Sequence, residues 1–229
     1  MAVTPNTDEA FLREVDEEVR RDQMIGIWRN YGRLIVGAVI AGLLVFAGVL
    51  GWRAYTHGQQ EAQAVKLQQA YDSLAAGDAK GAQASLDDLA KNGGPGYGAL
   101  ARLMDANKQL AAGNGKSAAA KYGEVAADTN VAQPLRDLAL IRQTFTDFDN
   151  LPPQTVIDRM KPLATKDSAW LGTAGEMTAM AYLKLNKTAE ARNMFKMIAG
   201  AEQVPDTIRQ RAVQAVDAVG GGANDQKGK

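Results

Sequence analysis

The feature that most constrains this chain is an uncharged run from Leu34 to Trp52, LIVGAVIAGLLVFAGVLGW, with Arg33 before it and Arg53 after it. Its roughly 19 residues extend about 28 Å as an α-helix, close to the ~30 Å hydrocarbon core of a bilayer. A core helix of a globular protein normally carries polar residues in every turn or two, whereas this run carries none. A cleaved secretory signal has a shorter apolar core behind a short basic region, whereas this run follows a leader rich in acids and bases. The run therefore predicts one uncleaved membrane anchor with its ends at Leu34 and Trp52.

Aromatic residues mark both ends of the predicted anchor. Trp28 and Tyr31 come just before the apolar run, and Trp52 and Tyr55 lie at its far end. Amphipathic rings favour the headgroup layer of a membrane, so we expect these four side chains at the two interfaces.

Basic residues near the anchor predict its orientation. More of them precede it than follow it: Arg20, Arg21, Arg29 and Arg33 on one side, Arg53 and Lys66 on the other. Lys and Arg near a span tend to stay in the cytoplasm, and acids contribute little. We therefore expect residues 1–33 to be a cytoplasmic leader, 34–52 a single span, and the rest to lie outside the cytoplasm.

The leader from Thr7 to Gly32 has the pattern of an amphipathic helix. Its apolar stripe consists of Phe11, Leu12, Val15 and Val19, and charged residues fill the other faces. Such a helix is either a tether near the membrane or a docking helix for a cytoplasmic or membrane partner. The pattern leaves both interpretations open.

Composition excludes several classes of function. The chain has no cysteine, which rules out disulfides, thiolate nucleophiles and cysteine metal sites. In the residues after the anchor, Lys and Arg nearly balance Asp and Glu, so this part of the chain has no broad electrostatic attraction to nucleic acid or anionic lipid. Abundant Ala and Gly, with apolar residues at helical spacing, predict an all-α fold packed through small residues.

Internal repetition is the strongest signal after the anchor. Similar stretches begin about every 36 residues, close to the ~34-residue period of helix-turn-helix solenoids. They are Leu74–Ala90, Leu110–Ala126, Phe148–Ala164 and Leu183–Ala199. Each predicts the end of one helix, a turn, and a second helix. The turns are expected at Gly77-Asp78, Gly113 to Gly115, Asn150 to Pro153, and Asn186-Lys187.

Each second helix shows one buried face. A small or β-branched residue is followed four positions later by a large one, giving the pairs Ala82 and Leu86, Ala118 and Tyr122, Val156 and Met160, Ala191 and Phe195. An aliphatic residue follows three positions after each large residue: Leu89, Val125, Leu163 and Ile198. The helix before each turn carries a matching small residue: Ala70, Ala106, Thr144 and Ala179. This pattern resembles tetratricopeptide repeats, in a degenerate form, because the first and third units depart from it.

The end of the chain predicts a cap and a tail. Pro205 opens a last amphipathic helix that would close the stack of repeats. Gly220 to Lys229 has no apolar side chain to bury, so we expect a disordered tail there. The expected repeat domain therefore runs over residues 53–219, followed by a tail at 220–229.

No motif points to catalysis, a cofactor or a metal. Gly113 to Ser117 ends like a phosphate-binding loop but follows a helical pattern instead of a strand, and Gly93 to Gly98 is interpreted as a connection between repeats. His57 is the only histidine, with no nucleophile or second histidine nearby. The carboxylate pairs Asp87-Asp88 and Asp147/Asp149 suit solvation. We expect a protein that is not an enzyme.

A candidate binding surface follows from the first helix of each repeat. Superposing the repeats puts Tyr71, Asn107, Phe145 and Met180 at equivalent positions. In helical-repeat stacks these positions line a concave groove that binds protein segments. The alternative is that they are partly buried packing residues.

The order of leader, anchor and repeats, with LGWRAY at Leu50 to Tyr55 where the anchor passes into the domain, resembles the ancillary subunit family of the bacterial Sec translocon. The repeat domain of that family is similar to that of cell division coordinators. The resemblance implies a single-pass protein of the bacterial inner membrane with a periplasmic domain. Its partners would be translocon subunits, periplasmic chaperones or exported chains, with no nucleic acid, small-molecule substrate or cofactor. The alternatives are an adaptor for envelope or cell-division assembly and a membrane-anchored enzyme with an unrecognised helical active site.

Overall fold

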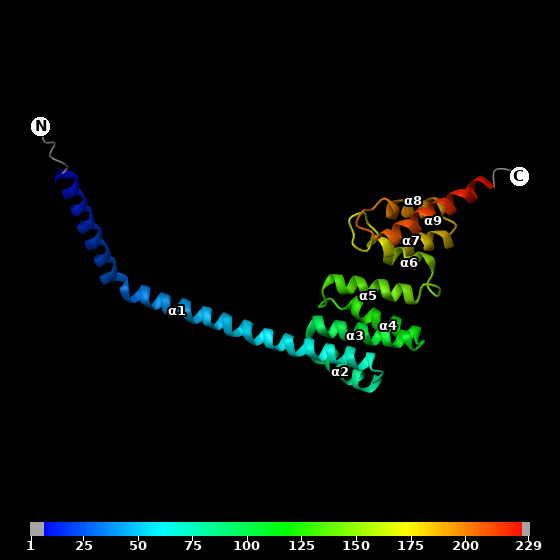
Figure 1. Ribbon diagram of the computed structural model, residues 1–229, viewed down its shortest axis with the longest axis horizontal. Helices are drawn as coiled ribbons and strands as arrows, with labels where there is room; N and C mark the ends of the chain where they lie inside the picture. The colour runs from blue at the N-terminus through cyan, green and yellow to red at the C-terminus, as the bar shows by residue number, and fades with distance from the viewer. Residues whose placement is uncertain (1–6, 226–229) are drawn as a thin grey trace. The chain divides into compact units, whose positions relative to one another are not determined.

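In the computed structural model of the protein, residues 7–225 are described, without the side chains of residues 7–24, 26, 27, 30 and 221–225. Every helix or strand assigned across these residues is an α-helix (Figure 1), which confirms the predicted all-α class. The helices are α1 (Thr7–Ala75), α2 (Ala79–Asn92), α3 (Gly94–Ala111), α4 (Gly115–Ala127), α5 (Gln133–Thr146), α6 (Pro153–Met160), α7 (Leu171–Lys184), α8 (Thr188–Ala199) and α9 (Asp206–Asp225).

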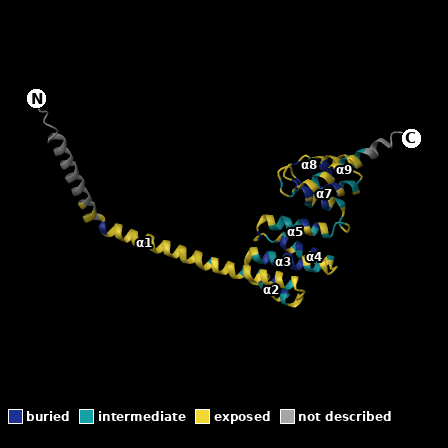
Figure 2. Cartoon of the chain, viewed as in Figure 1, coloured by how far each residue is buried: buried dark blue, intermediate teal, exposed yellow. Residues whose placement is uncertain are grey.

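The chain divides into two compact units between Ala62 and Gln63. The first unit consists of the greater part of α1, which is long and apolar enough to cross a membrane: an 18-residue window within it has a mean hydropathy of 2.6 and no buried residue. Figure 2 shows this stretch exposed. The predicted leader is helical from Thr7, continuous with the anchor, but its apolar stripe (Phe11, Leu12, Val15, Val19) lies outside the residues whose side chains are described.

The second unit is a stack of helix pairs. Successive helices pack on each other from α2 to α5 and from α6 to α9, while α5 touches α6 and α7 at fewer places. The end of α1 joins the stack, because Ala70 shares a core cluster with Leu86 of α2 and Ala101 of α3. An ion pair of 2.5 Å between Lys66 Nζ and Asp88 Oδ2 also links α1 to α2. No long linker therefore separates the long helix from the repeats.

The turns inside the repeats share one backbone geometry. Gly77, Gly113 and Asn186 have positive φ angles of 77°, 81° and 59°, and they stand at the same repeat position. The next residue of each turn donates its N–H to a carbonyl five residues earlier, at 2.8 to 2.9 Å, from Asp78 to Ser73, from Asn114 to Gln109 and from Lys187 to Tyr182. This is the Schellman ending of a helix, which glycine and asparagine adopt with least strain. The third repeat uses Pro152 and Pro153 instead, and α6 begins there.

The core is built from the residues that repeat. Three clusters of buried residues follow one another along the stack, the largest spanning α5 to α9. The small and large residues of the repeat pattern (Ala82, Leu86, Ala118, Tyr122, Val156, Met160, Ala191 and Phe195) are each at most 5% exposed. The matching small residues Ala70, Ala106, Thr144 and Ala179 are 0% exposed. Helices can approach closely at these positions because the side chains are short.

The structure corrects three expectations about element ends. The second helix of the third repeat stops at Met160, so Leu163 lies beyond it, half-buried, because Pro162 has no N–H to continue the helix. The connection at Gly93 to Gly98 is only Gly93, because a proline such as Pro95 is tolerated in the first turn of a helix, and α3 begins at Gly94.

The third correction concerns the expected tail from Gly220. α9 continues to Asp225, and residues 226–229 lie outside the described part of the chain. Glycine weakens a helix by about 1 kcal/mol relative to alanine but does not stop it as proline does. The lack of large apolar side chains after Val219 therefore did not predict where α9 ends.

Gly93 is expected to tolerate no side chain. A Cβ at this position would lie 2.5 Å from the carbonyl oxygen of Leu89 and 3.0 Å from the backbone nitrogen of Gly98. Because both atoms belong to the backbone, Gly93→Ala should lower the free energy of unfolding by about 2 kcal/mol. Gly96→Ala is the matched control, since apart from the adjoining backbone of its own helix nothing lies within 4 Å of a Cβ there. Urea unfolding of the full chain in detergent, followed by circular dichroism, measures both; equal stabilities would contradict the prediction.

Candidate functional site

The four candidate groove residues have exposed side chains. Tyr71 is 53% exposed, Phe145 64% and Met180 47%, and Asn107 is also exposed. They occupy the ends of α1, α3, α5 and α7, one residue after the buried small residue of each helix. Large apolar side chains exposed on a folded domain are candidates for contact with another molecule.

Two of these residues line one hollow. Phe145 of α5 and Met180 of α7 lie on the wall of a cavity of about 730 Å³ that opens between α5, α7, α8 and α9. Its other apolar lining is Phe148, Met177, Phe195, Ala215 and Ala218, and its polar lining is Asp149, Thr173, Glu176, Arg211 and Gln214. Phe195 was predicted only as a packing residue, and it serves both the core and this wall.

Helical spacing brings the remaining lining residues together. Thr173, Glu176, Met177 and Met180 recur three or four positions apart and so occupy one face of α7. Arg211, Gln214, Ala215 and Ala218 do the same on α9. The face of α9 that lines the hollow was not predicted, because the amphipathic pattern of this helix indicated only a cap. Its three-and-four spacing was the signal that could have found it.

Two ion pairs hold the rim of the hollow. Arg211 donates from Nε to Glu176 Oε1 at 3.0 Å and from Nη2 to Glu176 Oε2 at 2.7 Å. Lys184 Nζ lies 2.9 Å from Asp149 Oδ1 and 4.4 Å from the centre of the Phe148 ring. Hydrogen bonding to Glu176 raises the pKa of Arg211 above its ordinary value. Because each pair neutralises itself, the hollow suits apolar side chains of a ligand better than a strongly charged group.

Tyr71 and Asn107 do not line this hollow. Asn107 instead accepts a hydrogen bond of 2.5 Å at Oδ1 from the Tyr122 hydroxyl, which ties α3 to α4. Burial raises the pKa of Tyr122, although the charge of Arg142 opposes this, so the hydroxyl keeps its proton at neutral pH. The four predicted groove residues therefore do not share one surface. Phe145 and Met180 line the hollow, Asn107 is hydrogen-bonded to Tyr122, and Tyr71 lies near the end of α1.

The residues at the predicted membrane borders are exposed along α1. The exposed fractions are 62% for Trp28, 56% for Tyr31, 70% for Leu34, 71% for Trp52 and 65% for Tyr55. Their position at the membrane interfaces remains a prediction.

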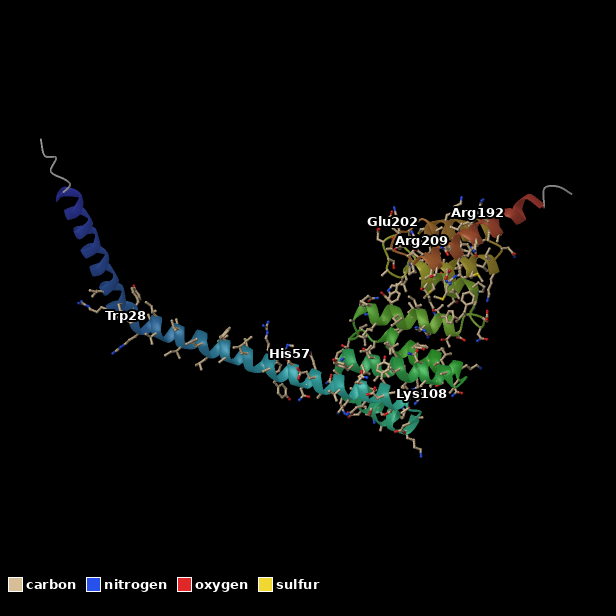
Figure 3. The ribbon with its side chains drawn as sticks, viewed as in Figure 1. Trp28, His57, Lys108, Arg192, Glu202 and Arg209 are labelled. Carbon is tan, nitrogen blue, oxygen red and sulfur yellow. The ribbon has the colours of Figure 1, made fainter. Side chains whose placement is uncertain are left out.

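The motifs weighed for chemistry occupy ordinary positions. Gly113 and Asn114 form the turn between α3 and α4, so the loop follows a helix instead of a strand. His57 is exposed on α1 (Figure 3). Asp88 pairs with Lys66 and Asp149 with Lys184, in separate places. Among the described residues, no group of three or more His, Cys, Asp or Glu is placed to hold a metal ion.

The buried carboxylate of Asp105 links α3 to α4. Asp105 is 8% exposed, with Lys121 Nζ 2.6 Å from its Oδ2 and Lys108 Nζ 3.1 Å from its Oδ1. Burial raises the pKa of Asp105, but the two ammonium groups beside the carboxylate outweigh this effect and hold the pKa below its ordinary value. The ionised carboxylate therefore stabilises the fold.

The stabilisation by Asp105 should disappear in acid. A carboxyl whose pKa is lower in the folded state than in the unfolded state stabilises the fold at pH values above its unfolded pKa of about 3.9. This stabilisation is lost as the pH falls through the pKa of the folded state. At pH 7, Asp105→Asn should lower the free energy of unfolding by about 2 kcal/mol. The difference from wild type should shrink below about pH 4, measured by urea unfolding at each pH. Asp158→Asn, at an exposed carboxylate, is the control; a difference that stays constant down to low pH would refute the assignment.

Comparison with protein families gives a match over most of the chain. Residues 26–218 match the family profile of the tetratricopeptide repeat-like domain. The matched range starts before Leu34 and ends within α9, so it includes both the apolar stretch and the helix pairs. No curated protein and no solved structure matches the chain.

Proposed function

Because the chain belongs to the tetratricopeptide repeat-like domain family, we propose that it is a membrane-anchored module whose repeat domain binds protein segments. In finer terms, we propose an accessory of the Sec translocon in the bacterial inner membrane. The apolar stretch from Leu34 to Trp52 anchors the chain, and the domain after Arg53 lies in the periplasm. The role requires neither catalysis nor a cofactor.

The observation that carries the binding role is the hollow shared by Phe145 and Met180. Both side chains are about half exposed or more, although they stand beside a well-filled core. Methionine and phenylalanine walls adapt to different apolar side chains, and a neutral rim does not select for charge. The ligand class that fits is a helical or extended protein segment with apolar anchors.

The translocon role is supported by the order of the parts. A leader, an anchor with LGWRAY at its end, and degenerate repeats resemble the ancillary translocon subunits. In this role the anchor lies beside the channel, and the repeat domain meets periplasmic chaperones or exported chains as they emerge.

A photoreactive amino acid at Phe145 tests the binding role in cells. We expect it to crosslink to periplasmic chaperones or exported chains, identified by mass spectrometry. Met180→Asp should reduce this yield by about tenfold or more, since an unpaired charge in an apolar site costs a few kcal/mol. Val213→Asp is the matched control, because Val213 is 49% exposed, similar to Met180 at 47%, but does not line the hollow. Equal loss in both variants would rule out a specific role for the hollow.

Crosslinking from the anchor tests the translocon role separately. A photoreactive residue at Leu43 should recover channel subunits. Recovery of cell-division or cell-wall enzymes alone would favour the adaptor for envelope assembly. Protease added to intact spheroplasts should digest the domain after Arg53, and full protection would reverse the proposed orientation.

A further inference from the structure

A recess lies in the surface of α1 just before the apolar stretch. It is lined by Trp28, Arg29, Gly32, Arg33 and Val36. Gly32 is buried although the residues around it are exposed, because the indole of Trp28, labelled in Figure 3, lies against the helix there. A Cβ on Gly32 would lie 3.5 Å from two atoms of that indole. A side chain larger than alanine at residue 32 would therefore fill the recess.

Two exposed guanidinium groups border the recess. Arg29 and Arg33 are one helical turn apart, about 6 Å along the helix axis. The nearest acidic residues along the sequence are Asp22 and Glu61. No acid therefore stands three or four positions from either arginine, where it would neutralise the charge on the same helix. The two positive charges act together on the same side of the apolar stretch.

From these contacts we propose that the recess binds the headgroup of an anionic phospholipid, an inference that rests on the proposed membrane anchor. Guanidinium groups bind phosphate oxygens through two parallel hydrogen bonds, and two of them favour a headgroup with net negative charge. The indole of Trp28 has an apolar ring and one N–H donor, a combination that suits the headgroup layer. Val36 and Leu34, exposed at 45% and 70%, begin the surface along which the acyl chains lie.

The shape of the recess distinguishes a specific headgroup site from a general attraction between basic residues and the membrane surface. A diffuse field acts on every anionic lipid near the helix and does not depend on a single glycine. Binding in the recess should depend on the absence of a side chain at Gly32 as much as on the charges of Arg29 and Arg33. Gly32→Leu fills the recess and leaves the net charge unchanged, so it separates the two explanations. Gly37→Leu is its matched control, because residue 37 does not line the recess and nothing beyond the adjoining backbone of α1 lies within 4 Å of a Cβ there.

Native mass spectrometry of the full chain in detergent tests the inference with an equimolar mixture of phosphatidylglycerol and phosphatidylcholine. Wild type should retain phosphatidylglycerol in preference, and both Gly32→Leu and the double variant Arg29→Gln/Arg33→Gln should lower that preference by about tenfold. Gly37→Leu and Arg53→Gln should keep it. A preference unchanged in Gly32→Leu would overturn the inference. So would equal competition by inorganic phosphate, because the anion alone would then be the ligand.

Carbonate extraction of membranes distinguishes failure of this inference from failure of the anchor. If wild type stays in the membrane pellet but shows no lipid preference, the anchor stands and the headgroup site is wrong. If wild type is released by carbonate, the anchor itself is wrong, and the headgroup site is overturned with it.

Discussion

Replacing Tyr122 with alanine is expected to lower the free energy of unfolding by about 4 kcal/mol. Tyr122 is 0% exposed and is the largest fully buried side chain among the described residues. It fills the cluster between α3, α4 and α5, where Ala106 and Ala118 are too short to close the cavity that its loss would leave. Urea unfolding of the full chain in detergent measures the effect.

Two further variants show which part of Tyr122 matters. Tyr122→Phe keeps the ring and loses only the hydrogen bond to Asn107, whose exposed amide can turn to water, so about 1 kcal/mol or less is expected. Tyr71→Ala removes a tyrosine that is 53% exposed and should change stability by about 0.5 kcal/mol at most. A loss below about 1 kcal/mol for Tyr122→Ala would mean that the core cluster around Tyr122 is not tightly packed.

Arginines at residues 43 and 44 are expected to abolish stable membrane insertion. Leu43 and Leu44 lie near the middle of the apolar run and are 62% and 69% exposed on α1. Each arginine at the centre of a span costs about 3 kcal/mol on insertion scales. The double variant Leu43→Arg/Leu44→Arg should therefore appear in the soluble fraction, or in the fraction that carbonate releases.

The control for this experiment carries the same charges outside the run. Gln59→Arg/Gln60→Arg places two arginines on α1 beyond Tyr55, where the predicted headgroup layer ends, and should stay in the carbonate-resistant pellet. If both double variants remain in the pellet, Leu34 to Trp52 is not the anchor. If both are released, the effect follows from added charge anywhere on α1.

The repeat pattern was predictable because it is local. A small residue, a large one four positions on and an aliphatic one after that describe a single helix face, and the structure buries Ala118, Tyr122 and Val125 on that face of α4. The turns at Gly77, Gly113 and Asn186 were also predictable, since glycine and asparagine are the residue types that most readily adopt positive φ angles. Where local signals were overlooked, as with Pro162 after α6, the predicted helix end was wrong.

The hollow was not predictable in the same way. Phe145 and Met180 were identified as equivalent positions, but nothing in the repeat alignment indicated that Arg211 of α9 would lie in the same wall or that Glu176 would hold it at 2.7 Å. Asn107 occupies the same repeat position and turns out to accept a hydrogen bond from Tyr122. Residues at equivalent repeat positions can have different surroundings, because the surroundings of each residue depend on the side chains of two neighbouring helices.

The sequence by itself determined the all-α class, the apolar stretch of α1 and the register of the helix pairs, because apolar length and a period near 3.6 residues are properties of a single segment. Only the tertiary structure decided which exposed side chains share a surface. Phe145, Met180 and Arg211 come from three helices that are far apart along the chain, and they meet only after the stack forms.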